Sequence, residues 1–318
     1  GLHDPVSKYI PAFADMKVAI PVASADGGAG EKPAKSKRRQ KDKDKKWRKD
    51  KDEVKGKDKE WGKKEAVEHR LVALETPMTI HHLLTHTSGL TNPGIEPTSD
   101  DTLATFVPKL AEAPLLFQPG TRWMYGNATI HLVLPRIIEI VSETPFDEFM
   151  QKRLFEPLAM DNSYFNVPSD KYSQLVVLEG LGNEKAKGKG KGWGGLSSSA
   201  EDFLHFEQML LNGGELFGNR VLSPATVKMM GSNQVGDLFA AAYKGEKAQN
   251  GMGFGYAVAV TLDPIAAGNH RGKGAFGWGG VAGTMSWTDP ENELVAVLML
   301  QQPRVRGFGK AVRQAIIE

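Results

Sequence analysis

The stretch that decides the fold is AFGWGGVAGTMSWTDPENELVAVLML, residues 275–300. It holds three apolar runs of strand length, separated by a glycine-rich turn and by the turn residues Asp289-Pro290-Glu291-Asn292. Reversals this short join neighbouring antiparallel strands. MGFGYAVAVTL, residues 252–262, reads as one more strand ahead of them. The segment therefore predicts an antiparallel meander.

The residues before the meander have the apolar spacing of helices. Four segments carry start or stop signals: Thr79 as an N-cap with Gly89 at the C-terminal end, 127–145 with a kink at Pro135, 199–214 with a capping box of Ser199 and Asp202, and 223–230 with Ser223 as cap. Residues 306–317 predict a terminal helix. Helices followed by an antiparallel sheet and a closing helix predict an α+β fold.

Composition excludes several classes of protein. The chain has 318 residues, 40% of them hydrophobic, which suffices for one sizeable domain. It has no cysteine, so disulfides and thiolate metal sites are excluded. No apolar run is long enough to span a bilayer, and no signal peptide is visible. Because the sequence opens on Gly1 rather than methionine, the missing signal does not decide the compartment.

A lysine-rich tract interrupts the first quarter of the chain. Residues 31–64 hold 17 basic and 8 acidic residues, whereas the net charge of the whole chain is +2. The tract has few apolar residues beyond Trp47, Val54 and Trp61, so it predicts a solvated, disordered insertion. A weak contact with a polyanion such as nucleic acid or anionic lipid is the alternative. We expect a single domain, with 1–22 and 251–318 as a sheet lobe, 24–70 as the insertion and 71–250 as a helical lobe.

Two candidate catalytic residues lie between a turn and a predicted helix. Tyr125 and Asn127 stand in RWMYGN, after a Pro119-Gly120 turn and before an apolar helix. A Tyr-x-Asn pair in this setting usually serves a reactive serine: the tyrosine relays a proton, and the asparagine amide orients the base or the acyl group. As packing residues, Tyr125 would be a half-buried core tyrosine and Asn127 a helix cap.

The candidate binding residues lie on the predicted strand that contains Trp278-Gly279-Gly280. The glycines let a substrate lie against the backbone, and the N–H of Val281 is a candidate donor to an oxyanion. His86, in LLTHTSG, is tempting as a base, but we interpret it as structural, with hydrogen bonds around the Gly89 turn. The histidines show no metal-ligand spacing, and no cofactor is implied.

Five ordered blocks carry a family resemblance. They are MTIHHLLTHTSGL, QPGTRWMYGNATI, FEPLAMDNSYF, GGLSSSAEDFLHFEQMLLNGGE and FGWGGVAGTMSWTDPENELVAVLM. Together they resemble the serine β-lactamase-like family of class C β-lactamases, family VIII carboxylesterases and penicillin-binding proteins. The resemblance covers 1–22 and 71–318. It implies an antiparallel sheet flanked by helices, a helical lobe and a serine nucleophile.

The family's nucleophile motif is absent from this sequence. No serine is followed by a lysine three residues later, although Ser-x-x-Lys supplies nucleophile and base in these enzymes. The resemblance places that helix, with two N-terminal strands, just before GLHDPVSKYIPAF. We expect that the sequence starts after it; a degenerate pseudoenzyme, or a piece that pairs with a separate N-terminal piece, are the alternatives.

The resemblance implies hydrolysis of short-chain esters through an acyl-enzyme, with β-lactams as a weak side activity. Trp278-Gly279-Gly280 is similar to the esterases and lacks the cation and hydroxyl that grip a β-lactam carboxylate. The alternative is an inactive binding module that uses the basic tract as an attachment arm. The compartment is left open, although the resemblance favours a periplasmic or secreted location.

Overall fold

The computed structural model describes residues 1–22, 68–90, 95, 97–98, 100–178, 195–245, 248–280 and 283–300. The chain divides into two compact units, Gly1–Ala19 with Leu71–Glu318, and Ile20–Arg70. In the smaller unit, Val22 donates its backbone N–H to the carbonyl of Glu68 at 2.7 Å. The Lys-rich tract, the predicted terminal helix at 306–317 and Val281 lie outside the described residues. All candidate site residues that the structure describes belong to the larger unit.

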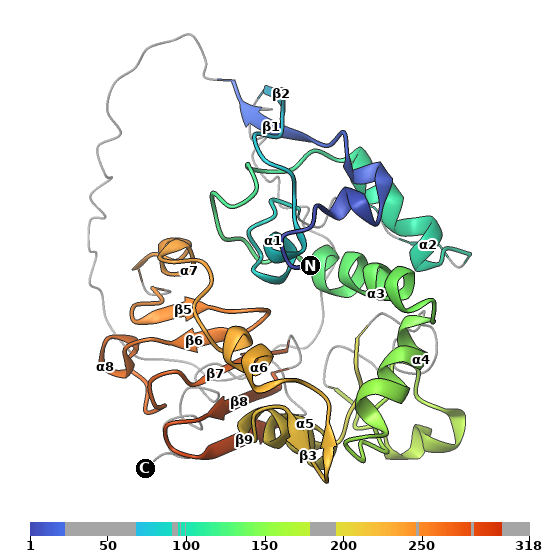
Figure 1. Cartoon of the computed structure of the whole chain (residues 1–318), viewed down its shortest axis with the longest axis vertical. Helices are drawn as coiled ribbons and strands as arrows, with labels where there is room; N and C mark the ends of the chain where they lie inside the picture. Colours follow the sequence, from blue (N-terminus) through green and yellow to red (C-terminus); the bar gives the residue numbers. More distant parts are fainter. Residues whose placement is uncertain are drawn as a thin grey trace, which may run out of the picture. The chain divides into compact units, whose positions relative to one another are not determined.

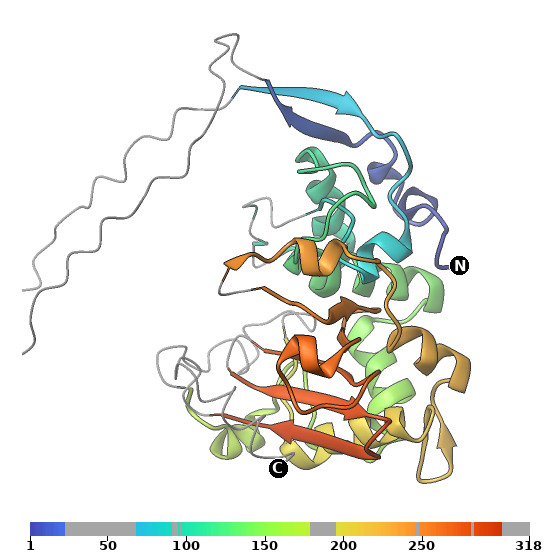
Figure 2. The same cartoon turned by 90° about the vertical axis from the view of Figure 1, so that its left-hand side faces the viewer.

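The predicted meander forms a five-stranded antiparallel sheet. In Figure 1 its strands follow one another from β5 down to β9, and Figure 2 shows the same strands after a turn of 90°. Its strands follow one another in chain order: β5 (Met252–Phe254), β6 (Ala259–Thr261), β7 (Phe276–Gly279), β8 (Met285–Asp289) and β9 (Leu294–Leu298). The predicted turn after β8 is held by Asp289, whose carboxylate accepts from the N–H of Asn292 at 3.2 Å. The α+β fold is confirmed.

The interpretation of 252–262 as one strand was wrong. β5 and β6 are the two arms of a hairpin, closed by a hydrogen bond from Gly255 N–H to Val258 O at 2.8 Å. Ala257 takes a left-handed backbone, with φ of 62°. A side chain at Gly255 would lie 1.9 Å from the carbonyl oxygen of Met230, so glycine is required at this approach. Alternating apolar residues continue through the turn, which is why the pattern hid the reversal.

Helix α5 (Ala200–Leu211) packs across β8 and β9, next to them in Figure 1. Ser199 caps it as predicted, since its hydroxyl accepts from the N–H of Asp202 at 3.1 Å. The reciprocal half of the box does not form. Asp202 instead accepts from the N–H of Asn162 at 2.7 Å and the hydroxyl of Ser163 at 2.8 Å, which ties the helix to a distant loop.

The described part of the chain also contains further helices, helical turns and one small hairpin. The α-helices are α1 (Ile80–Leu84), α2 (Leu103–Phe106), α3 (Leu134–Ser142), α4 (Phe146–Met150), α6 (Pro224–Met230), α7 (Leu238–Ala241) and α8 (Pro264–Ala267). The 3-10 turns are η1 (Val6–Lys8), η2 (Pro11–Phe13), η3 (Val107–Glu112) and η6 (Ser169–Gln174), the π-turns are η4 (Thr129–Val133) and η5 (Gln151–Phe155), and a small hairpin joins β3 (Glu215–Leu216) to β4 (Asn219–Arg220). In the described part of the chain, no helix has the length and apolarity to cross a membrane.

Residues 1–22 do not join the main sheet, contrary to the expected sheet lobe. β1 (Lys17–Pro21) pairs with β2 (His69–Ala73) in a separate two-stranded sheet. Val6, Ile10 and Phe13 are buried in the core of the helical part instead. The composition of a short strand does not identify its partner, and these apolar side chains are covered by helices rather than by strands.

The helix predicted over 127–145 begins with an irregular turn. η4 is a π-helix, and α3 starts after it with Pro135 in its first turn. Proline is tolerated there because the first N–H groups of a helix have no partner. The irregularity therefore precedes Pro135, directly after the Tyr125–Asn127 segment, and π-turns often occur at functional sites.

Candidate functional site

The structure brings Tyr125 and Trp278 together, although 152 residues separate them in the sequence. Their rings are stacked, with centroids 5.9 Å apart and planes inclined by 14°. Trp278 extends from β7, whereas Tyr125 lies in the segment before η4. The tyrosine is 38% exposed and the tryptophan is half-buried, so solvent reaches the pair.

A cluster of aromatic rings supports the stacked pair from behind. Phe254 of β5 packs edge-on against Trp278, with centroids 5.4 Å apart, and lies 5.2 Å from Trp123. Phe239 of α7 meets Trp123 at 4.8 Å, and Tyr243 lies 5.6 Å from it. Rings packed in this way fix one another, because each has few alternative rotamers in a filled core. The site therefore has a rigid apolar wall.

Burial raises the pKa of the Tyr125 phenol above its ordinary value of 10.0. The cause is desolvation, which disfavours the phenolate. The hydroxyl is thus a neutral donor at neutral pH, able to act as a proton relay when a cation lies beside it.

Asn127 lies two residues after Tyr125 at the beginning of the helical turn, and it is exposed. Among the described residues, no side chain or backbone group hydrogen-bonds its amide. The amide is free to meet a substrate, which agrees with its predicted role, although that role stays a prediction.

Gly279 ends β7 and Gly280 follows it, and both glycines are exposed. The N–H of Gly280 donates to Thr284 O at 2.8 Å, and the N–H of Gly283 closes the turn onto Gly280 O at 3.0 Å. A side chain at Gly280 would lie 2.4 Å from the Thr284 hydroxyl oxygen. The glycines thus keep the strand end narrow beside Trp278. Val281 lies outside the described residues, so its oxyanion role stays a prediction.

A junction between α1 and the β5–β6 hairpin aligns the two halves of the site. The N–H of Ala257 donates to Leu84 O at 2.8 Å, and the Tyr256 hydroxyl lies 3.2 Å from Nδ1 of His81. His82 points elsewhere, because its Nδ1 accepts the N–H of Thr79 at 3.2 Å and completes the cap of α1. Gly89 does not cap this helix, which ends at Leu84 with Thr85 as its C-cap. No group of residues suited to hold a metal occurs in the described ranges.

His86 is the site residue whose partner the sequence reasoning missed. It is buried, but its ring faces the Tyr125 segment rather than the Gly89 turn: Nδ1 accepts the N–H of Gly126 at 3.2 Å. Burial lowers the pKa of His86 to about 4, and the positive field of His131 adds a smaller effect. The available signal was the run of polar residues Thr85-His86-Thr87-Ser88 straight after a helix, all of them buried.

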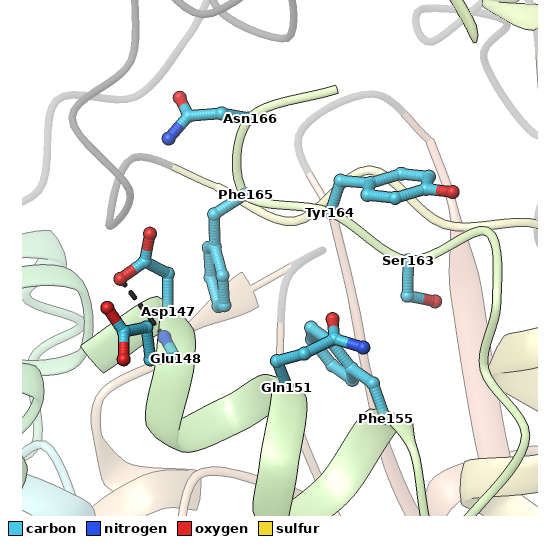
Figure 3. A pocket seen from close by; sticks show the side chains of 8 residues that line it. All are labelled: Asp147, Glu148, Gln151, Phe155, Ser163, Tyr164, Phe165 and Asn166. Carbon is cyan, nitrogen blue, oxygen red and sulfur yellow. Dashed lines mark hydrogen bonds between the residues drawn. The ribbon is translucent and has the colours of Figure 1, made fainter. Parts of the chain in front are cut away.

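An open pocket of about 260 Å³ lies between α4, η5 and residues 163–166 (Figure 3). The side chains of Asp147 and Glu148 lie together on one side of Phe165, and the Tyr164 ring points away from them. The pocket shares no residue with the Tyr125–Trp278 pair. Its acidic residues are exposed on a short helix, so the chemistry argued above belongs to the aromatic site instead.

Comparisons with known proteins bear on the family and the fold. The family model Beta-lactamase matches residues 64–318. A Mycobacterium tuberculosis protein is 29% identical over 250 residues, which cover 70% of this chain and 62% of that protein. Lovastatin esterase of Penicillium rubens is 30% identical, over 71% of this chain and 64% of the enzyme. The chain thus spans less than two thirds of the length of these curated relatives.

Among solved structures, EstCE1, a hydrolase with promiscuous acyltransferase activity, superimposes with a TM-score of 0.68. The match covers all of this chain and 78% of EstCE1, at 22% sequence identity. At that identity the likeness concerns the fold, and it confirms the predicted arrangement of an antiparallel sheet flanked by helices.

Proposed function

Because the chain belongs to the Beta-lactamase family, we propose that it is part of a serine hydrolase that cleaves carboxylic esters through an acyl-enzyme. The observation that carries the proposal is the stacked pair of Tyr125 and Trp278, exposed on one side and backed by buried rings on the other. A hydroxyl beside an apolar wall supports the proposal, because an ester with a non-polar acyl or alcohol group needs both a proton relay and an apolar surface.

The proposed reaction has two halves. A serine hydroxyl attacks the ester carbonyl, and its proton passes through Tyr125 and a lysine to the leaving alcohol. Backbone N–H groups of the serine and Val281 hold the oxyanion, while Asn127 orients the acyl group. Water then attacks the acyl-enzyme by the reverse proton path and releases the acid. Since the sequence contains no Ser-x-x-Lys, the proposal assigns that serine and lysine to residues outside it.

The wall favours esters over β-lactams. Trp278, Gly279 and Gly280 present an indole face and two bare backbone positions, with neither a cation nor a hydroxyl among them. A β-lactam carboxylate would find no partner on these three residues, whereas a short, uncharged ester needs none. The name of one similar protein, a lovastatin esterase, supports this choice.

Complementation with short p-nitrophenyl esters tests the proposal. Residues 1–318 alone should give no turnover, because the nucleophile and base of the family are absent. Adding a segment with the Ser-x-x-Lys helix of a family member should produce turnover. Tyr125→Phe should then lower kcat by about 10²–10⁴-fold, the usual range for a lost general acid or base.

Tyr243→Phe is the matched control, since Tyr243 also belongs to the aromatic cluster but packs on Trp123 and Phe239. It should keep the complemented activity. Turnover by 1–318 alone that survives Tyr125→Phe would show that the catalytic groups lie elsewhere.

The absence of Ser-x-x-Lys favours one alternative, a binding module without catalysis. That module would bind apolar esters on the same wall. Ester binding that depends on Trp278, together with no turnover under complementation, would support it.

A further inference from the structure

The backbone of His86 holds the residue before Tyr125. His86 follows the end of α1 in a left-handed conformation, with φ of 55°. In this conformation its carbonyl accepts the N–H of Met124 at 3.0 Å. Residues other than glycine and asparagine seldom adopt positive φ, so this geometry carries an energetic cost that the surrounding structure must offset.

The ring of His86 holds the residue after Tyr125. Nδ1 accepts the N–H of Gly126 at 3.2 Å, and the Thr129 hydroxyl, which donates to Gly126 O at 2.6 Å, lies 3.3 Å from the same nitrogen. An acceptor nitrogen carries no proton, so the neutral ring has its proton on Nε2. In the described part of the chain Nε2 has no partner, and the hydrogen bonding of the ring is all directed at the Tyr125 segment.

The same ring also contacts the tyrosine itself. The centroids of His86 and Tyr125 are 4.6 Å apart, closer than those of Tyr125 and Trp278. Gly126 passes close to the turn after His86: a Cβ added there would lie 2.5 Å from Leu90 O, so any larger residue would displace this segment. His86 thus contacts the Tyr125 segment in three places: its carbonyl binds Met124, its Nδ1 binds Gly126, and its ring packs on the Tyr125 ring.

We propose that His86 is the positioning residue of Tyr125, fixing the phenol against Trp278 through the Met124 and Gly126 hydrogen bonds and the ring contact. This inference rests on the proposed function for its catalytic meaning, but its geometry can be tested without catalysis. His86 does not act as the base, since its ring is 1% exposed and its acceptor nitrogen is engaged. It acts through Tyr125.

Two substitutions separate this role from simple core packing. His86→Asn keeps an acceptor oxygen close to the place of Nδ1, and asparagine tolerates positive φ. His86→Leu keeps apolar bulk but loses the acceptor. Leu83→Ala is the control, because Leu83 is buried in α1, three residues before His86, and belongs to the core cluster of Val6 and Ile10.

The readout is ¹⁹F NMR of the full chain labelled with 3-fluorotyrosine. The Tyr125 resonance is assigned by its loss in Tyr125→Phe, and the other five tyrosines serve as internal references. In His86→Leu we expect the Tyr125 resonance to shift and its pKa to fall toward the value of exposed tyrosines in the same spectrum. In His86→Asn both should stay at wild-type values. Leu83→Ala should lower Tm without moving the resonance.

Two results would overturn the inference: an unmoved Tyr125 resonance in folded His86→Leu, or an equal displacement by Leu83→Ala. If His86→Leu does not fold, a Tyr125 resonance displaced in His86→Asn as far as in the unfolded chain would overturn it as well. Under complementation, His86→Leu should lower kcat about tenfold or more with KM nearly unchanged, and His86→Asn should restore it. Lack of any wild-type turnover would refute the proposed function, whereas the NMR result alone decides the role of His86.

Discussion

At the scale of single residues, two histidines make the stability of the protein depend on pH. Burial lowers the pKa of His82 and of His86 to about 4, from an ordinary value of 6.5. The unfolded chain takes up protons below pH 6.5 that the folded chain cannot accept until pH approaches 4. The stabilisation is therefore complete above pH 6.5 and is lost as pH falls from 6.5 toward 4.

For His86 the loss over this window should be on the order of 3 kcal/mol. Thermal denaturation between pH 7.5 and 4.5 measures it. His86→Asn should show a shallower decrease of Tm on acidification, because it removes one of the histidines whose pKa is lowered by burial. Equal pH dependence in the variant and the wild type would contradict the assignment to His86.

The sequence predicted the ends of the site better than its support. Tyr125 stands in a turn before a helix, and Trp278 with the two glycines stands in a glycine-rich strand. Both patterns can be recognised from neighbouring residues alone, without knowledge of the fold. The contact of His86 with Gly126 joins residues 40 positions apart. No local pattern selects such a partner, since burial and tertiary packing decide it.

At the scale of elements, Asp202 anchors α5 to the loop at 162–163. Asp202 is 3% exposed, and its carboxylate accepts from Asn162 N–H and the Ser163 hydroxyl. Asp202→Ala would remove this acceptor from both donors, so we expect a loss of about 1–3 kcal/mol in the free energy of unfolding. Glu201→Ala, an exposed position in the same turn, should change it by less than about 0.5 kcal/mol. Chemical denaturation of both variants measures these free energies of unfolding. Equal losses in the two variants would contradict the anchoring role of Asp202.

Helices were predicted correctly where the apolar spacing and a capping residue agreed. Elements were missed where one sequence pattern is compatible with two structures. Ser199 and Ser223 cap helices as expected. Residues 252–262 keep their apolar alternation through a tight turn, and only the approach of Gly255 to Met230 O reveals the hairpin. The first 22 residues were expected in the sheet lobe, yet Val6, Ile10 and Phe13 belong to a core cluster built largely from helical residues.

At the scale of the whole molecule, the lysine-rich tract should be dispensable for folding. Residues 26–66 contain few apolar side chains, and the buried clusters of the described residues gather on both sides of it in the sequence. Replacing 26–66 by a short Gly/Ser linker should leave Tm within about 2 °C, since surface changes rarely exceed about 0.5 kcal/mol.

Limited trypsin digestion tests the same tract in the intact chain. The first cleavages should fall within 26–66, because this tract is rich in lysine and its composition predicts a solvated insertion. Protection in the free protein would contradict this expectation. Protection that appears only with DNA or anionic vesicles would identify the tract as a polyanion-binding arm.

The stacking of Tyr125 on Trp278 also has a consequence for the order of folding. A contact between positions so distant in the chain closes a very long loop. Such contacts form slowly, because the chain loses the entropy of loop closure before the contact contributes any stabilisation. The site should therefore mature last, after α5 and the β7–β9 meander have assembled. Stopped-flow refolding followed by Trp278 fluorescence, with the other tryptophans replaced by phenylalanine, should lag behind the recovery of circular dichroism, and simultaneous recovery of both signals would exclude this order.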